Sequence, residues 1–186
     1  MKTEIEARLL DINEEEFIET LKSHNATFIG DWFMSRNVYD LKPADDGKWM
    51  RLRTNGVETT LTIKEIVDKS IEGTKETEIV VSDFDTTNEI LNKLGYFARG
   101  SQTNRRIRYI LDDVEIDIDF WPMIPTYVEF EADATQKIKD LCKKLDIDFD
   151  SLTTMSVPEV YEHYGLPVRT NPAIMNLEQE RVDKKY

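Results

Sequence analysis

The sequence predicts an α+β protein in which a closed antiparallel β-barrel forms a tunnel and helices pack outside it. Two observations predict this fold. Seven segments alternate apolar and polar residues at every second position, as strands with two different faces do. Their polar positions repeatedly hold pairs of acids or pairs of bases, whereas a solvent-facing sheet usually mixes Thr, Ser, Gln and Lys. Closing the sheet gives these charges partners, because a lumen sets them against each other or against charged ligands.

Length and composition fit one domain in a reducing, aqueous compartment. The chain has 186 residues, a net charge of -13 and one cysteine, Cys142. A single cysteine allows no intrachain disulfide, which favours a cytoplasmic location. The acidic balance argues against binding to nucleic acid. The N-terminus lacks the apolar run of a signal peptide, and no stretch approaches the ~18 apolar residues of a spanning helix, so no membrane contact is expected.

The chain opens with a strand and a helix. In TEIEARLL, the charged face holds Glu4, Glu6 and Arg8, and the other face is apolar. Asn13 can cap a helix that runs to about Asn25, because an acid follows three residues later and an apolar stripe begins there.

Three more charged strands follow this helix. The segment KWMRLRT places Arg51 and Arg53 on one face, and TTLTIK places Lys64 on a face shared with two threonines. The segment KETEIVV then places Glu76 and Glu78 together. The first two of these strands are basic and the third is acidic, so the signs are mixed between strands, and the charged faces are expected to converge on a lumen.

The second half of the chain repeats the pattern after a helix from about Thr86 to Leu94, which Gly95 ends. Three charged strands, NRRIRYIL, VEIDIDF and YVEFEA, come next. Their charged faces hold, in chain order, Arg106 and Arg108, then Glu115, Asp117 and Asp119, then Glu129 and Glu131.

Two helices and a polar tail complete the chain. An apolar stripe predicts a helix over residues 134–145, and a short helix is expected from Pro158 to Gly165. Residues 1–165 are therefore expected to form the tunnel domain. Residues 166–186 are expected to be a polar C-terminal tail, either a surface helix or a disordered end.

These charged elements, in this order, resemble the CYTH family, or triphosphate tunnel metalloenzymes, which includes class IV adenylyl cyclases, thiamine triphosphatases and inorganic triphosphatases. The family opens with Glu-x-Glu-x-Lys, which Glu4, Glu6 and Arg8 fill with arginine in place of lysine. The match extends over most of residues 1–165 through the RLR at 51–53, the LTIK ending at Lys64, Glu76 and Glu78, Arg106 and Arg108, Asp119, and Glu129 and Glu131.

One further stretch fits the family only in part. Tyr39 and Asp40 match a Tyr-Asp pair of the strand that follows the first helix. The family often has an acidic residue before this pair, where the present chain has Arg36 and Asn37.

The resemblance implies a divalent-metal-dependent enzyme that holds a triphosphate in its tunnel. The triphosphate-binding residues would be Arg8, Arg51, Arg53, Lys64, Arg106 and Arg108. Mg²⁺ or Mn²⁺ would be held by the catalytic acids Glu4, Glu6, Asp119, Glu129 and Glu131, with Glu76 and Glu78 in support. Asp119 is preferred over Glu115 and Asp117, because one strand rarely commits three acids to one metal ion.

Three functions remain open on the residues alone. The first is hydrolysis of inorganic triphosphate or of a small organic triphosphate. The alternative is a class IV adenylyl cyclase that converts ATP to cyclic AMP and pyrophosphate, which would need an adenine pocket and an aligned ribose hydroxyl. The third is a binding module without turnover, which would not need the acidic pairs. The expected partner is a small-molecule triphosphate, and the sequence leaves a homodimer open.

Overall fold

The structure, a computed structural model, describes residues 2–45 and 47–166. The strands are β1 (Lys2–Leu9), β2 (Thr27–Asp45), β3 (Lys48–Thr54), β4 (Thr59–Ile66), β5 (Thr74–Val81), β6 (Ala98–Leu111), β7 (Val114–Phe120) and β8 (Tyr127–Ala132). The helices are α1 (Glu14–Ser23), α2 (Phe84–Lys93), α3 (Thr135–Lys144) and α4 (Val157–His163), with a short 3-10 turn η1 (Phe149–Ser151). The tail expected over 166–186 lies, beyond its first residue, outside the described residues.

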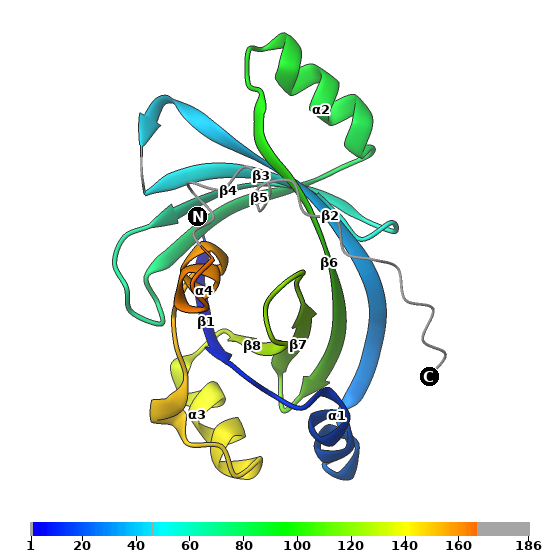
Figure 1. The fold of residues 1–186 in the computed structure, drawn as a ribbon, viewed down its shortest axis with the longest axis vertical. Coiled ribbons are helices and arrows are strands. Elements are labelled where there is room, and N and C mark those ends of the chain that lie inside the picture. The colour runs from blue at the N-terminus through cyan, green and yellow to red at the C-terminus, as the bar shows by residue number, and fades with distance from the viewer. Residues whose placement is uncertain (1, 46, 167–186) are drawn as a thin grey trace.

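The described strands close into one antiparallel barrel with the order β1-β5-β4-β3-β2-β6-β7-β8 (Figure 1). This confirms the expected fold class. In this ring β1 lies opposite β2, and β8 lies opposite β3. The two pairs of opposite strands matter for the site, because side chains on them face each other across the lumen.

Strand β2 was not predicted from charge alternation, although it is the longest strand at 19 residues. It pairs with β3 on one side and with β6 on the other. The register with β6 shifts between Phe28 and Gly30 and again between Val38 and Tyr39. Each shift interrupts the two-residue period, so the sequence of β2 does not show one continuous charged face.

A tight turn fixes the register of the two most highly charged strands. Asp112 and Asp113 join β6 to β7 and have φ angles of 51° and 59°. Two consecutive left-handed residues are typical of a type I′ hairpin turn, and aspartate tolerates this conformation better than most residues. The turn sets Arg108 opposite Asp117 and Arg106 opposite Asp119.

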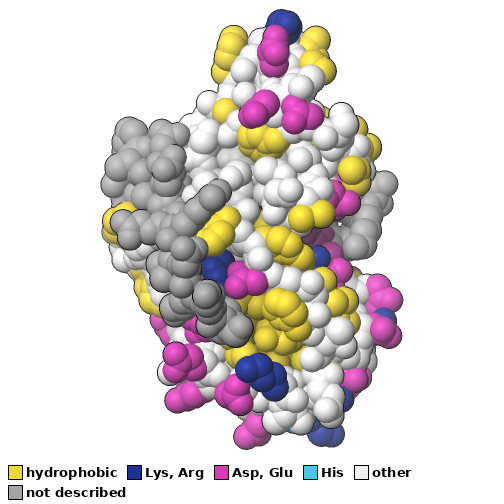
Figure 2. Space-filling model, turned by 90° about the vertical axis from the view of Figure 1, so that its right-hand side faces the viewer, with side chains coloured by type: hydrophobic (Ala, Val, Ile, Leu, Met, Phe, Trp, Pro, Cys, Tyr) yellow, Lys and Arg dark blue, Asp and Glu magenta, His cyan; other side chains and the backbone are white. Residues whose placement is uncertain are grey.

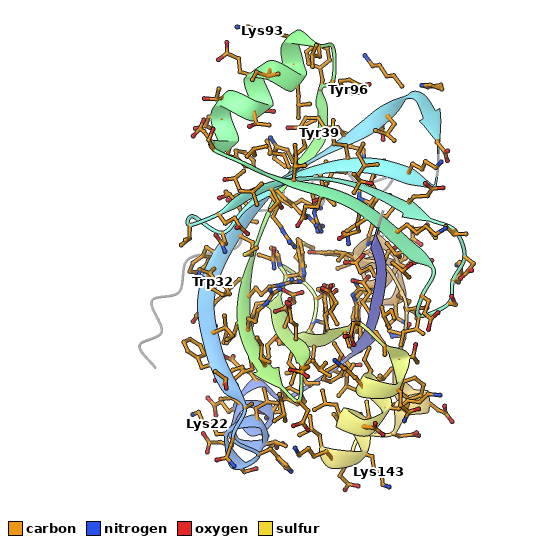
Figure 3. The ribbon with its side chains drawn as sticks, turned by 180° about the vertical axis from the view of Figure 1, so that it is seen from behind. Lys22, Trp32, Tyr39, Lys93, Tyr96 and Lys143 are labelled. Carbon is orange, nitrogen blue, oxygen red and sulfur yellow. The ribbon has the colours of Figure 1, made fainter. Side chains whose placement is uncertain are left out.

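The hydrophobic core lies outside the barrel, between strands and helices, as the sequence predicts. Residues of α1 and α3 pack on the outer faces of β6, β7 and β8. Helix α2 covers Tyr39, Met50 and Leu52, and Figure 3 shows Tyr39 beneath it. The cover is incomplete over β4 and β5, where Ile63 and Ile79 are 37% and 57% exposed.

Helix boundaries follow their capping residues. The side chain of Asn13 accepts a hydrogen bond from the backbone N–H of Glu16 at 3.1 Å, which confirms the predicted start of α1. Helix α2 begins earlier than predicted, because Asp83 caps it by accepting a hydrogen bond from the backbone N–H of Thr86 at 2.6 Å.

The outside of the molecule carries much of the acidic charge. On the face shown in Figure 2, acidic side chains gather at the top, where α2 lies, and along the lower edge. None of the helices in the described part of the chain combines the length and apolar character needed to cross a membrane.

Candidate active site

The barrel encloses a cavity of about 1000 Å³ that is lined mainly by charged side chains. Figure 3 shows nitrogen- and oxygen-bearing side chains from the surrounding strands pointing into the barrel interior. The predicted site residues that line the cavity are Glu4, Glu6, Arg8, Arg51, Arg53, Lys64, Glu76, Glu78, Arg106, Arg108, Glu129 and Glu131. Asp119 does not line it.

Lys64 joins the acids of two neighbouring strands. Its Nζ lies 2.9 and 2.8 Å from the two carboxylate oxygens of Glu4 on β1, and 2.8 Å from Oε1 of Glu76 on β5. Burial raises the pKa of Glu4 to about 8, although Lys64 opposes this shift. Burial would raise the pKa of Glu76, but the charges of Lys64 and Arg51 outweigh this effect, so the pKa of Glu76 is lowered. Glu4 is therefore a buried carboxyl that one lysine does not fully stabilise.

Arg8 binds acids of its own strand and of the neighbouring strand β8. Its Nη2 lies 2.9 Å from Oε1 of Glu6 and forms a close ion pair with Glu129, while its Nη1 donates to the carbonyl of Met155 at 2.6 Å. A lysine has only one side-chain nitrogen, so it could not bind the acids and the carbonyl of Met155 through separate nitrogens as Arg8 does. The arginine that replaces the family's lysine therefore also ties β1 to the segment before α4.

Arg106 is held by a ring of acids at the centre of the barrel. It lies 2.5 Å from Asp117, 2.5 Å from Asp119 and 3.2 Å from Glu129. Although burial opposes it, these carboxylates raise the pKa of Arg106 well above its ordinary value. Arg108 binds the same Asp117 through Nε and Nη2, both at 2.7 Å. Asp117 thus links the two arginines of β6.

Asp119 was expected to bind metal from the lumen, and the structure places it behind Arg106. Its side chain is 0% exposed. Its two oxygens accept from Nε and Nη2 of Arg106 at 2.8 and 2.5 Å, and Asn104 donates to Oδ1 at 3.0 Å. Burial raises the pKa of Asp119 to about 6, against the effect of Arg106. In this structure Arg106 and Asn104 occupy both oxygens of Asp119, so a cation could bind Asp119 only if Arg106 moved away.

Arg51 and Arg53 have looser contacts than the other predicted bases. Arg51 Nη2 lies 3.7 Å from both Glu76 and Glu78, and its buried Nε has no hydrogen-bond partner. Within residues 2–45 and 47–166, no hydrogen bond or ion pair is found for Arg53. These two arginines of β3 therefore retain donors for a ligand.

A row of three glutamates crosses adjacent strands on the lumen side. Glu6 of β1 lies opposite Glu131 of β8, which lies opposite Glu115 of β7. All three line the cavity. Like charges directly opposite each other destabilise a sheet, so this wall favours a bound cation. Carboxylate oxygens are the ligands that Mg²⁺ and Mn²⁺ prefer.

The acidic side chains of the described residues are of the kind that binds a divalent cation, but in this structure they are not arranged as metal ligands. Within the ranges that the structure covers, no three acids already converge as metal ligands do. Glu6 is paired with Arg8, and Glu115 lies 2.5 Å from Arg108. Binding a cation on this wall would require these arginines to release their carboxylates, for example to a ligand with phosphate oxygens.

Sequence reasoning did not place several of the cavity-lining residues in the lumen, among them Arg36, Gln102, Asn104 and Trp121. The ring of Trp121 lies 4.2 Å below the guanidinium of Arg36. Met34, Arg36 and Val38 share one face of β2 and all line the cavity, so strand parity is the signal that could have placed Arg36 in the lumen.

Comparisons with known proteins agree with this architecture. A family model described as the CYTH domain matches residues 2–152. The PH1012 protein from Pyrococcus horikoshii OT3 has a TM-score of 0.73 and 23% identity over 84% of this chain and 98% of that one. A Vibrio parahaemolyticus protein proposed to be an adenylate cyclase has a TM-score of 0.70 and 16% identity, over 87% of this chain and 98% of that one.

A protein from Hippeastrum has the same fold at lower similarity. HpAC1 from Hippeastrum, a proposed adenylyl cyclase described as having a dominant triphosphatase activity, gives a TM-score of 0.58 and 14% identity. The match covers 89% of this chain and 96% of that one. A search of proteins with curated descriptions finds no match.

Proposed function

This chain belongs to the CYTH domain family, whose model spans residues 2–152, and we propose that it hydrolyses a triphosphate with the help of a divalent metal ion. The substrate is inorganic triphosphate or a small organic triphosphate. The observation that carries this proposal is the distribution of cations around one cavity of about 1000 Å³. The bases come from β1, β3, β4 and β6, so a ligand must be long to contact them all.

The bases hold and polarise the phosphate chain. A triphosphate carries about four negative charges, and fixed cations stabilise it through charge-assisted hydrogen bonds. The residues proposed to bind it are Arg8, Arg51, Arg53, Lys64, Arg106 and Arg108. Hydrolysis requires the attacked phosphoryl group to be fixed in line with water and its developing charge to be stabilised. Arginines anchored on several strands can do both without moving the backbone.

The acids are proposed to fall into two groups. Glu4, Glu6, Glu129 and Glu131 would hold Mg²⁺ or Mn²⁺. The bound ion would neutralise charge on phosphate oxygens. Glu76 would position Lys64, from which it lies 2.8 Å, Glu78 would face Arg51 at 3.7 Å, and Asp119 would orient Arg106 from behind it.

Cyclisation of ATP is the second candidate. Trp49 lines the cavity beside Lys64 and offers a ring on which an adenine could stack. The dominant triphosphatase activity of HpAC1, which has the same fold, supports hydrolysis as the first activity to measure. Both reactions use the same phosphate-binding bases, so the product decides between them.

One assay tests the proposal. Purified protein is incubated with inorganic triphosphate, thiamine triphosphate, ATP or pyrophosphate, each with Mg²⁺, Mn²⁺ or a chelator, and phosphate and cyclic AMP are both measured. We expect phosphate release from a triphosphate only with a divalent metal ion, and slower release from pyrophosphate. Cyclic AMP as the main product from ATP would favour the cyclase. No turnover of any triphosphate would contradict the proposal.

A further inference from the structure

Two arginines face each other on neighbouring strands of the lumen. Arg36 of β2 lies directly opposite Arg53 of β3 in the antiparallel register, and both side chains line the cavity. Like charges in this position repel each other. At the same level of β6, the residue opposite Arg36 is the neutral Gln102. Therefore no acid lies directly opposite Arg36 on β6, the next strand of the ring.

Neither guanidinium is neutralised within the described part of the chain. Arg36 donates to Oε1 of Gln102 through Nε and Nη2, at 3.0 and 2.7 Å, and makes no ion pair there. Its Nη1 has no acceptor among these residues. Burial, followed by the charge of Arg51, lowers the pKa of Arg36 to about 10. The pKa of Arg53 falls to about 9, chiefly because of Arg51 and then because of burial.

Arg36 is nevertheless held in a fixed position. Its guanidinium stacks on the ring of Trp121 at 4.2 Å while Gln102 binds its edge. Trp121 in turn packs with Tyr127 and Tyr161 in a buried cluster at α4. An arginine that is stacked and hydrogen-bonded on its inner edge, with its outer nitrogen free, is preorganised for an anion.

The pair lies on the wall opposite the acids. In the closed ring, β2 and β3 are the strands across from β1 and β8, which carry Glu6 and Glu131. The lumen therefore has one wall rich in acids and a facing wall with two uncompensated bases. A chain of phosphates that meets a cation on the first wall can extend its far end to the second.

We propose that Arg36 and Arg53 form one subsite that binds an unesterified terminal phosphoryl group of the triphosphate. This proposal rests on the proposed function and adds Arg36 to its binding residues. A terminal phosphoryl group carries more charge than an esterified one, so two adjacent guanidinium groups favour it. An organic triphosphate would then enter with its free end toward Arg36 and leave its organic group at the other end.

The test is equilibrium binding of inorganic triphosphate without metal, measured by titration calorimetry in a chelator. Arg36→Gln and Arg53→Gln should each weaken binding by about tenfold, the effect of losing one charge-assisted hydrogen bond. The double variant should depart from the product of the two single effects, because both residues contact one group. Arg99→Gln is the matched control, since Arg99 also lines the cavity but is paired with Asp40 at 2.7 Å.

Arg36→Lys separates charge from packing. It keeps the positive charge and should bind triphosphate more tightly than Arg36→Gln, whereas equal loss in both variants would show that only stacking on Trp121 matters and would overturn the subsite. Unchanged binding in Arg36→Gln, with normal binding by the wild type, overturns the subsite alone. Absence of binding by the wild type, with or without Mg²⁺, overturns the proposed function as well.

Discussion

Asp119 accepts two hydrogen bonds from Arg106, Nε to Oδ1 at 2.8 Å and Nη2 to Oδ2 at 2.5 Å, and it is completely buried behind that arginine. The two residues are cross-strand neighbours on β6 and β7. A two-point contact of this kind fixes both the position and the plane of a guanidinium. The function of Asp119 is therefore linked to how Arg106 meets a ligand.

Asp119→Asn tests this role against the metal-binding role that the sequence suggested. The amide keeps one acceptor but loses the charge, so Arg106 should be less well oriented. We expect the KM for triphosphate to rise by about tenfold, which corresponds to one weakened charged hydrogen bond. The Mg²⁺ concentration for half-maximal activity should stay nearly constant. A large rise in that concentration, with little change in KM, would restore Asp119 as a metal ligand.

The glutamate wall gives a prediction for the metal ion. Glu6→Gln combined with Glu131→Gln should raise the Mg²⁺ concentration needed for half-maximal activity by about tenfold or more, because a hard cation loses two oxygen ligands. Glu129→Gln with Glu131→Gln should have a similar effect. That pair is less specific, because Glu129 also binds Arg8 and Arg106.

The control for the metal prediction is Glu58→Gln in the exposed turn between β3 and β4. This variant removes one acid at a distance from the cavity lining and should leave the Mg²⁺ dependence unchanged. Full activity of the Glu6→Gln, Glu131→Gln protein at limiting Mg²⁺ would remove the wall from the metal assignment.

Arg51 gives the clearest test of phosphate binding. Its ion-pair distances of 3.7 Å show that no acid holds it closely. Arg51→Ala should reduce kcat/KM for triphosphate hydrolysis by more than about tenfold, and Arg53→Ala should do the same. Thermal stability should change little. Lys75→Ala, an exposed position on the outward face of β5, is the control and should retain activity.

Arg106→Ala should also reduce hydrolysis by more than about tenfold, but for two reasons. The variant removes a phosphate contact and leaves Asp117, Asp119 and Glu129 without their shared cation. Breaking a buried ion pair by removing one partner destabilises a protein by about 3 to 5 kcal/mol. We therefore expect a lower melting temperature in this variant but not in Arg51→Ala, which a thermal scan of both proteins would show.

The sequence predicted the barrel because strand parity is a local property. Glu4 and Glu6, or Arg51 and Arg53, share a face wherever the strand lies, and a lumen was the structure that made such pairs favourable. Arg36 was missed because Met34 and Val38, which share its face of β2, are apolar, and because the register shift between Val38 and Tyr39 interrupts the strand's two-residue period. A bulge depends on how two strands pair, which one strand's sequence does not reveal.

The assignment of acids to metal could not be made by parity alone. Asp119 lies on the lumen side of β7, as predicted, but Arg106 stands between it and the cavity. Which acid meets a base and which meets a ligand depends on side-chain depth and on the strand opposite. The glutamate row across β1, β8 and β7 also required the strand order, because β1 is distant in sequence from β7 and β8.

The first turn of α4 contributes a pH-sensitive contact at the cavity. Glu159 accepts from the backbone N–H and the hydroxyl of Ser156, both at 2.8 Å, and from Lys69 Nζ at 3.0 Å. Burial would raise the pKa of Glu159, but the hydrogen bonds from Ser156 and Lys69 outweigh this effect, so the pKa of Glu159 is lowered to about 2. Both Ser156 and Glu159 line the cavity.

A lowered pKa in the folded state means that the ionised carboxylate stabilises the fold. This stabilisation is complete above the ordinary pKa of 4.5 and is lost as the pH falls through 4.5 toward about 2. We expect the wild-type melting temperature to fall more steeply across this window than that of Glu159→Gln, which has no charge to lose. Glu162→Gln on the exposed side of α4 should follow the wild-type curve. Parallel curves for wild type and Glu159→Gln would show that the carboxylate does not secure the start of α4.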